Sequence, residues 1–225
     1  MENFVNLQYC IVKKKINNHR KRLKRTRYNL DEKLLVDIIK NHISDYKKSK
    51  LEYVYYISTL INSFYSTRMG CDRLYEVAKY ISKYKNVQNI KSVIQIIDKA
   101  SEEKFFVKYA DKESKKFGAY SFLSKYYAIH NRILFNNGNF SDFPICDNRV
   151  EKQLKIILHS VKNNNKHYTK DFIEEMKVFK IKDIKSYSKL YKMLCFIKEE
   201  INRTKPKKQP NASLTTVDNY FWSFE

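Results

Sequence analysis

The chain of 225 residues has little glycine or proline, with only three of each. A β-sandwich, a β-barrel or a doubly wound sheet of this length needs many tight turns, which these two residues supply. Their scarcity argues against those architectures and predicts an all-α fold. Hydrophobic residues make up 43% of the chain and aromatic residues 15%, too many for a disordered polycation. We therefore expect one folded, mostly helical domain over residues 1–225.

Closely spaced cysteines and long apolar runs are also absent. The four cysteines are scattered and lack the spacing of a zinc site or an iron–sulfur cluster, so we expect reduced thiols, no metal and no cofactor. No run reaches about 18 apolar residues, and the first residues lack the basic and then apolar order of a secretory signal. These features predict a cytoplasmic protein without a membrane-spanning helix.

Positive charge is abundant: 45 Lys and Arg residues stand against 24 Asp and Glu residues, for a formal net charge of +21. Such an excess attracts polyanions, of which nucleic acid is the main candidate and an anionic membrane surface the rival. The basic segment 13–27 holds nine Lys or Arg residues and no acid, so it is either a solvated helix face or a phosphate-binding arm. It lacks the strong facing apolar stripe of a membrane-surface helix, which favours DNA. Its candidate DNA contacts are Arg20, Arg22 and Arg25.

Apolar residues recur at helical spacing along most of the chain. The pattern predicts helices at about 30–47, 51–69, 72–84, 90–103, 119–135, 148–162, 169–179 and 184–203, and a short final helix capped by Ser213. Residues 136–146 form a turn-rich loop, and residues 204–210 are expected to form a basic surface linker before the final helix.

Two residues, one before and one after the 136–146 loop, are candidate catalytic residues. Lys125 is the one lysine in an apolar stretch that contains Phe122, Leu123 and Ile129. Loss of hydration there would disfavour its ammonium form and leave some neutral amine to act as a nucleophile. Asp147 lies 22 positions later, where it could orient that amine. The same residues also fit a purely structural alternative. In it, Lys125 extends along the helix to reach solvent, and Asp147 only caps the next helix.

A resemblance adds to this interpretation. The string Ser121-Phe-Leu-Ser-Lys125-Tyr-Tyr-Ala-Ile-His130-Asn, followed by Phe143-Pro-Ile-Cys-Asp147-Asn-Arg-Val, resembles the core motif of bacterial proteins with the 8-oxoguanine DNA glycosylase fold. These proteins belong to the helix-hairpin-helix DNA glycosylase superfamily. Segments 61–67 and 217–222 are also similar to that group. The resemblance implies two helical subdomains around a cleft, with Lys125 attacking the sugar C1′ and Asp147 assisting.

The sequence departs from the family pattern at two places. The glycine–hydrophobic–glycine hairpin that precedes the lysine is reduced to Gly118, which weakens the expected backbone grip on DNA phosphate. The cysteine-rich tail of the iron–sulfur members is absent. The basic segment 13–27 could supply the missing phosphate contacts.

A flipped base would need an aromatic pocket and polar groups to contact its edges. The candidate pocket residues are Asn62, Tyr65, Tyr126, Tyr127 and Phe143, each of which could instead belong to the core. Asn62 could read a base edge or satisfy buried backbone groups. His130 is interpreted as structural or supportive. Arg149 is a candidate DNA contact or the partner in a surface salt bridge.

The function predicted from these observations is a DNA N-glycosylase with abasic-site lyase activity, because an amine nucleophile passes through a Schiff base that permits strand cleavage. DNA is the expected partner and the expected oligomeric state is a monomer. The alternative is a non-catalytic, helical nucleic-acid-binding protein. The excised base, the strand preference and the choice between DNA repair and anti-phage defence stay open.

Overall fold

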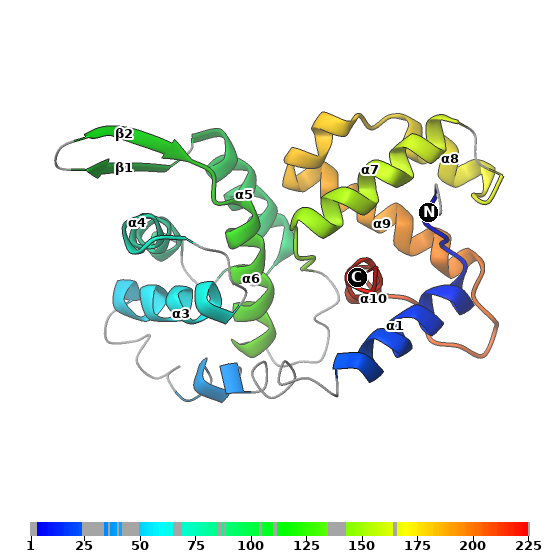
Figure 1. Ribbon diagram of the computed structural model, residues 1–225, viewed down its shortest axis with the longest axis horizontal. Coiled ribbons are helices and arrows are strands. Elements are labelled where there is room, and N and C mark those ends of the chain that lie inside the picture. The colour runs from blue at the N-terminus through cyan, green and yellow to red at the C-terminus, as the bar shows by residue number, and fades with distance from the viewer. Residues whose placement is uncertain are drawn as a thin grey trace. The chain divides into compact units, whose positions relative to one another are not determined.

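The computed structural model divides the chain into two compact units (Figure 1). The terminal unit comprises Met1–Arg25 and Phe140–Glu225, and the central unit comprises Thr26–Asn139. The structure describes residues 4–23, 34–35, 37–39, 41, 50–64, 69–84, 87, 89–103, 105–109, 112–134, 143–163 and 166–224.

The central unit is built mainly from four helices: α3 (Lys50–Phe64), α4 (Cys71–Ser82), α5 (Ile90–Glu103) and α6 (Tyr120–Leu134). Helix α3 packs on α4 and α6, and α5 also packs on α6. The aliphatic side chains that recur at helical spacing are those that become buried, among them Ile57, Val77, Ile97 and Leu123. The helices predicted at 72–84, 90–103 and 119–135 are confirmed.

A two-stranded hairpin between α5 and α6 was not predicted. Strand β1 (Phe105–Tyr109) pairs antiparallel with β2 (Lys112–Phe117), with Phe106 opposite Lys116 and Val107 opposite Lys115. The ribbon extends away from α5 and α6 (Figure 1). The Phe105 ring contacts the Tyr80 ring of α4 edge-on, with 5.2 Å between centroids. The prediction of a mostly helical chain is confirmed. This segment is the exception, because phenylalanine and valine are residue types that favour strands.

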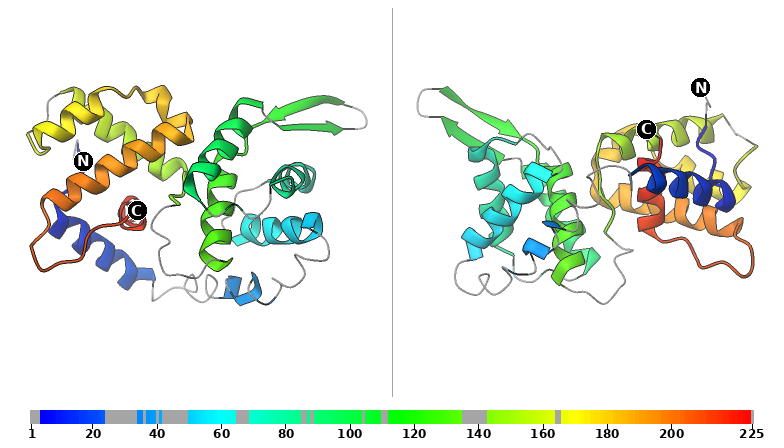
Figure 2. Two further views of the ribbon diagram at one scale, coloured as in Figure 1. Left: turned by 180° about the vertical axis from the view of Figure 1, so that it is seen from behind. Right: turned by 60° about the horizontal axis from the view of Figure 1, so that its bottom comes forward.

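The terminal unit contains α1 (Tyr9–Leu23), α7 (Asn148–Lys162), α8 (Lys170–Lys177), the 3-10 helix η3 (Ile181–Lys185), α9 (Tyr187–Arg203) and α10 (Leu214–Trp222). Helix α10 packs against α1, α7 and α9 (Figure 2). Ser213 caps α10 by accepting a hydrogen bond from the Thr216 N–H at 3.2 Å, as predicted. The helix expected over 184–203 begins at Tyr187, after η3.

Hydrogen bonds join the N-terminal segment to the far end of the sequence. The Tyr168 hydroxyl donates to the Val5 carbonyl at 2.9 Å, and the Tyr9 hydroxyl donates to the Pro210 carbonyl at 2.8 Å. The Tyr220 hydroxyl donates to the Asn6 carbonyl. The terminal unit therefore depends on contacts between residues about 160 to 210 positions apart.

Candidate functional site

Lys125 lies in a continuously buried stretch of α6, residues 122–127. Its side chain is 7% exposed, and its neighbours Leu123, Ser124, Tyr126 and Tyr127 are buried as well. Helix α6 is covered by α3 and α5, so several consecutive positions face protein rather than one stripe. Lysine is rarely buried to this extent in a folded protein. Of the two interpretations of the sequence, the one with Lys125 in apolar surroundings fits this burial.

Aromatic rings lie beside Lys125 along the helix. The Tyr126 ring stacks on the His130 imidazole at 5.1 Å between centroids and meets the Tyr127 ring edge-on at 5.5 Å. Tyr53 of α3 meets His130 from the side at 6.2 Å. Tyr126 and Tyr127, two of the predicted pocket residues, are 1% and 3% exposed. Both rings therefore lie in the interior of the central unit.

Burial of His130 lowers its pKa from 6.5 to about 4, because the charged imidazolium loses its hydration inside the central unit. The imidazole is therefore neutral in the folded protein near pH 7. This environment fits the structural role predicted for His130.

The depressed pKa of His130 predicts acid sensitivity. In the unfolded chain His130 has a pKa of 6.5, so below that pH the unfolded chain binds a proton on His130. The folded chain does not bind this proton until the pH approaches 4, so its stability falls as the pH decreases towards 4. The free energy of unfolding should drop by about 3 kcal/mol from this group between pH 7 and pH 4. Urea unfolding of the wild type and of His130→Phe, which keeps an aromatic ring, measures the difference between their pH profiles. His159→Asn, at an exposed histidine, should keep the wild-type profile. Parallel profiles for the wild type and His130→Phe would contradict this prediction.

Asn62 is held by the backbone that follows α3. Its side-chain Nδ2 donates to the Met69 carbonyl at 2.9 Å, and its Oδ1 accepts from the Met69 N–H at 3.0 Å. These two bonds correspond to the backbone-satisfying role that the sequence left open for Asn62. Tyr65, which the sequence also assigned to the pocket, lies outside the described residues.

Asp147 caps α7 in the terminal unit. Its Oδ1 accepts hydrogen bonds from the Arg149 N–H at 2.9 Å and from the Val150 N–H at 3.2 Å. The Pro144 carbonyl just before it accepts a hydrogen bond from the Tyr187 hydroxyl at 2.9 Å, which ties the segment to α9. Asp147 is half-buried, as is the predicted pocket residue Phe143. The carboxylate is thus held in one orientation at the start of α7.

Polar and aromatic groups gather where α7 packs on α10. The Arg149 guanidinium lies over the Trp222 ring, 4.3 Å from its centroid, a cation–π contact that the sequence did not predict. Gln153, one turn further along α7, is 5% exposed. Within the described part of the chain, neither the Gln153 Oε1 atom nor the Trp222 Nε1 atom has a hydrogen-bond partner. No pattern in the sequence points to Gln153, because a glutamine on a helix is usually solvated.

The predicted catalytic pair is divided between the two units: Lys125 belongs to the central unit, and Asp147 to the terminal unit. Each side chain is placed by its own helix, α6 for the lysine and α7 for the aspartate. The approach of the amine to the carboxylate stays a prediction.

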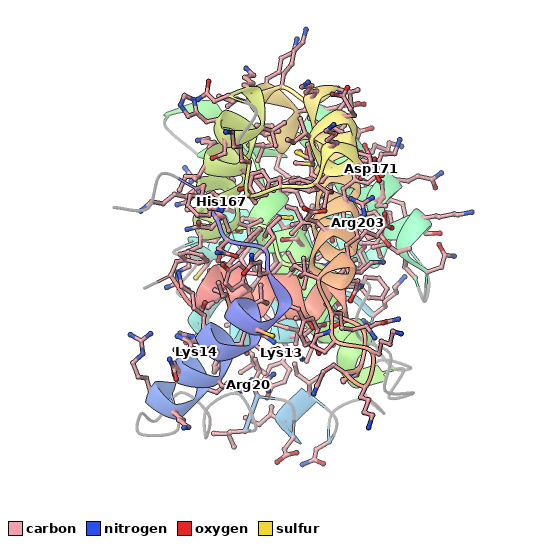
Figure 3. The ribbon with its side chains drawn as sticks, turned by 90° about the vertical axis from the view of Figure 1, so that its right-hand side faces the viewer. Lys13, Lys14, Arg20, His167, Asp171 and Arg203 are labelled. Carbon is pink, nitrogen blue, oxygen red and sulfur yellow. The ribbon has the colours of Figure 1, made fainter. Side chains whose placement is uncertain are left out.

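Much of the basic segment 13–27 lies on α1. Val12 and Ile16 are buried, whereas Lys14, Arg20 and Arg22 are exposed. Figure 3 shows Lys13, Lys14 and Arg20 along this helix. The Lys15 ammonium lies over the Phe224 ring, 3.7 Å from its centroid. One face therefore docks α1 and the other presents cations, while Arg25 lies outside the described residues.

Among the described residues, no group of three or more His, Cys, Asp or Glu side chains could hold a metal ion. Within the same residues, no helix combines the length and the apolar character needed to cross a bilayer.

Residues 11–134 match the family HI_0787_N, which is described as an N-terminal domain. The matched range is more than half of the chain; it includes Lys125 and ends before Asp147. No curated protein and no solved structure matches the chain.

Proposed function

The chain belongs to the HI_0787_N family over residues 11–134, and we propose that it is a DNA N-glycosylase that uses Lys125 as its nucleophile. The observation that carries this proposal is the burial of Lys125, 7% exposed, on a helix that also buries Leu123, Tyr126 and Tyr127. Burial holds the Lys125 amine in a defined place, which a nucleophile needs in order to attack carbon. The likeness of segments 121–131 and 143–150 to the 8-oxoguanine DNA glycosylase fold, with its helix-hairpin-helix architecture and central cleft, agrees with this assignment.

In the proposed reaction the Lys125 amine attacks C1′ of the target nucleotide. The bond from C1′ to the base nitrogen breaks, its electron pair leaves with the base, and the base takes up a proton. The lysine nitrogen loses one proton. The C1′–O4′ bond then breaks, its electron pair goes to O4′, and O4′ takes up a proton to become a hydroxyl, which leaves a protonated Schiff base between Lys125 and C1′. Asp147 would stabilise the positive charge that develops on the sugar. The same Schiff base permits the lyase reaction.

Positive charge supports DNA as the partner. The exposed cations of α1 can contact phosphates, and the net charge of +21 attracts a polyanion over a longer range. These same cations also favour a second candidate, a nucleic-acid-binding protein without chemistry.

Borohydride trapping tests the proposal directly. The protein is incubated with DNA that carries a set of modified bases, and borohydride is added to reduce any Schiff base to a stable amine. A covalent protein–DNA adduct on at least one substrate is expected. DNA binding without an adduct on any substrate would favour the non-catalytic alternative.

Asp147→Asn separates a catalytic carboxylate from a helix cap. Asparagine caps helices about as well as aspartate, so the free energy of unfolding should change by less than about 0.5 kcal/mol. Base release should slow by about 10-fold or more because the negative charge is lost. Single-turnover kinetics measure the rate. Asp171→Asn, which removes an exposed charge from the first turn of α8, is the control and should keep the wild-type rate. An unchanged rate for Asp147→Asn would limit Asp147 to capping.

A further inference from the structure

Residues 177–182 run from the end of α8 through a turn into the first residues of η3, and they expose two aliphatic side chains of the terminal unit. Val178 is 72% exposed and Ile181 is 50% exposed. The other large apolar side chains that are exposed in the described part of the chain, Leu34, Tyr56 and Tyr75, all belong to the central unit. Aliphatic groups this exposed gain free energy when a partner covers them.

Buried neighbours hold this turn in place. Phe179 and Ile184 are 7% and 1% exposed, and the Phe179 ring lies 6.1 Å from the Phe196 ring of α9. The Asp183 carboxylate accepts hydrogen bonds from the Lys180 N–H at 2.8 Å and from the Lys189 ammonium at 2.7 Å. Because the turn is anchored at both ends, little conformational entropy would be lost when Val178 and Ile181 meet a partner.

Cations flank the two aliphatic side chains. Lys180 and Lys182 are exposed and lie on either side of Ile181 in the sequence. Lys177, next to Val178, is paired with Glu174 at 2.8 Å. Residues 177–182 therefore present two exposed aliphatic side chains interspersed with exposed lysines, which fits a partner that carries both apolar and anionic groups.

Contacts to α7 join the turn to the end of the unit that carries Asp147. The Lys185 ammonium, at the end of η3, contacts the Glu151 carboxylate in the first turn of α7 at 2.7 Å. Tyr187, two residues later, donates to the Pro144 carbonyl just before Asp147. The 3-10 helix that follows the turn is thus attached to the helix that Asp147 caps.

We propose that Val178 and Ile181 form an apolar wedge that enters the base stack of DNA, while Lys180 and Lys182 contact the flanking phosphates. Two aliphatic side chains are far fewer than the 20 to 30 residues of a stable protein interface, and a five-residue 3-10 helix is too short to lie in a membrane surface. They match the apolar residues that other DNA-binding proteins insert between base pairs. The proposal rests on the proposed function in taking DNA as the partner, and it requires no base excision.

Equilibrium binding to two duplexes tests the wedge. One duplex is intact and the other carries a stable abasic-site analogue, which leaves a gap in the stack. The double variant Val178→Ser/Ile181→Ser should bind the abasic duplex about 10-fold more weakly than the wild type does, with a smaller loss on the intact duplex. Leu34→Ser removes an aliphatic side chain that is 58% exposed in the central unit, and it should bind both duplexes as the wild type does.

A charge variant tests the lysines separately. Lys180→Gln/Lys182→Gln should weaken binding to both duplexes and flatten the slope of log K against log salt by about two.

An unchanged affinity of the serine variant for the abasic duplex would overturn the wedge, as would an equal loss in Leu34→Ser. A wild type that binds neither duplex would also overturn it. Loss of binding to phosphatidylglycerol vesicles with unchanged DNA affinity would instead assign the turn to a membrane.

The outcomes distinguish the wedge from the glycosylase mechanism. Borohydride trapping by a serine variant that binds abasic DNA normally would leave the mechanism intact and remove the wedge. The opposite result is that the wild type forms no adduct, whereas Val178→Ser/Ile181→Ser weakens binding to the abasic duplex. That result would support the wedge and contradict the glycosylase mechanism.

Discussion

Lys125→Gln is expected to abolish borohydride trapping and to slow base release by about 10³-fold or more, because the amide nitrogen of glutamine cannot form a Schiff base. Glutamine nearly matches lysine in length and carries no charge, so it can occupy the buried position on α6. The melting temperature and the affinity for DNA should stay close to those of the wild type. Gel analysis of the reduced adduct and single-turnover kinetics measure the effect.

Lys79→Gln is the matched control for this substitution. It makes the same chemical change at an exposed lysine on α4 in the same unit, and it should retain full trapping. An adduct that persists in Lys125→Gln would mean that another amine attacks the sugar. Unchanged DNA binding by both variants, with no adduct from the wild type, would identify the protein as a nucleic-acid binder.

Glu200→Ala is expected to lower the free energy of unfolding by about 3 kcal/mol. The Glu200 carboxylate is 3% exposed and joins α9 to the start of α8. It accepts hydrogen bonds from the Thr169 N–H at 2.8 Å, the Thr169 hydroxyl at 2.7 Å and the Arg203 guanidinium at 3.0 Å. Alanine would leave the partly buried Thr169 and Arg203 donors without this acceptor. Urea unfolding followed by circular dichroism measures the loss.

The exposed Glu174–Lys177 pair on α8 provides the comparison. Its atoms are as close, 2.8 Å, but the glutamate side chain is 72% exposed. Solvent screens this pair, so Glu174→Ala should change stability by less than about 0.5 kcal/mol. Equal effects of Glu200→Ala and Glu174→Ala would show that burial does not strengthen the Glu200 network.

Helix positions followed from local sequence alone. The helices over Cys71–Ser82, Ile90–Glu103 and Asn148–Lys162 lie within a few residues of their predicted ranges. Ser213 was likewise predicted as the cap of α10. Apolar spacing and caps involve residues a few positions apart, so a single sequence contains the information.

The hairpin over Phe105–Phe117 shows where local rules failed. Scarce glycine argued against strands, but one two-stranded ribbon needs few tight turns. Its strands are held by each other and by contacts of β1 with α4, including the ring contact between Phe105 and Tyr80. The spacing of apolar residues within one segment does not show that another strand or helix will pair with it.

Tertiary structure alone decided how the candidate residues are used. The sequence identified Lys125, Asn62 and Arg149, but it left two roles open for each. Helices α3 and α5 pack over α6 and bury Lys125, Met69 engages the amide of Asn62, and Trp222 lies under Arg149. Each of these outcomes depends on a residue or helix that only folding brings close, and the composition of one segment carries no information about that partner. The division of Lys125 and Asp147 between two units has the same origin, because Met1–Arg25 and Phe140–Glu225 form one body through long-range contacts.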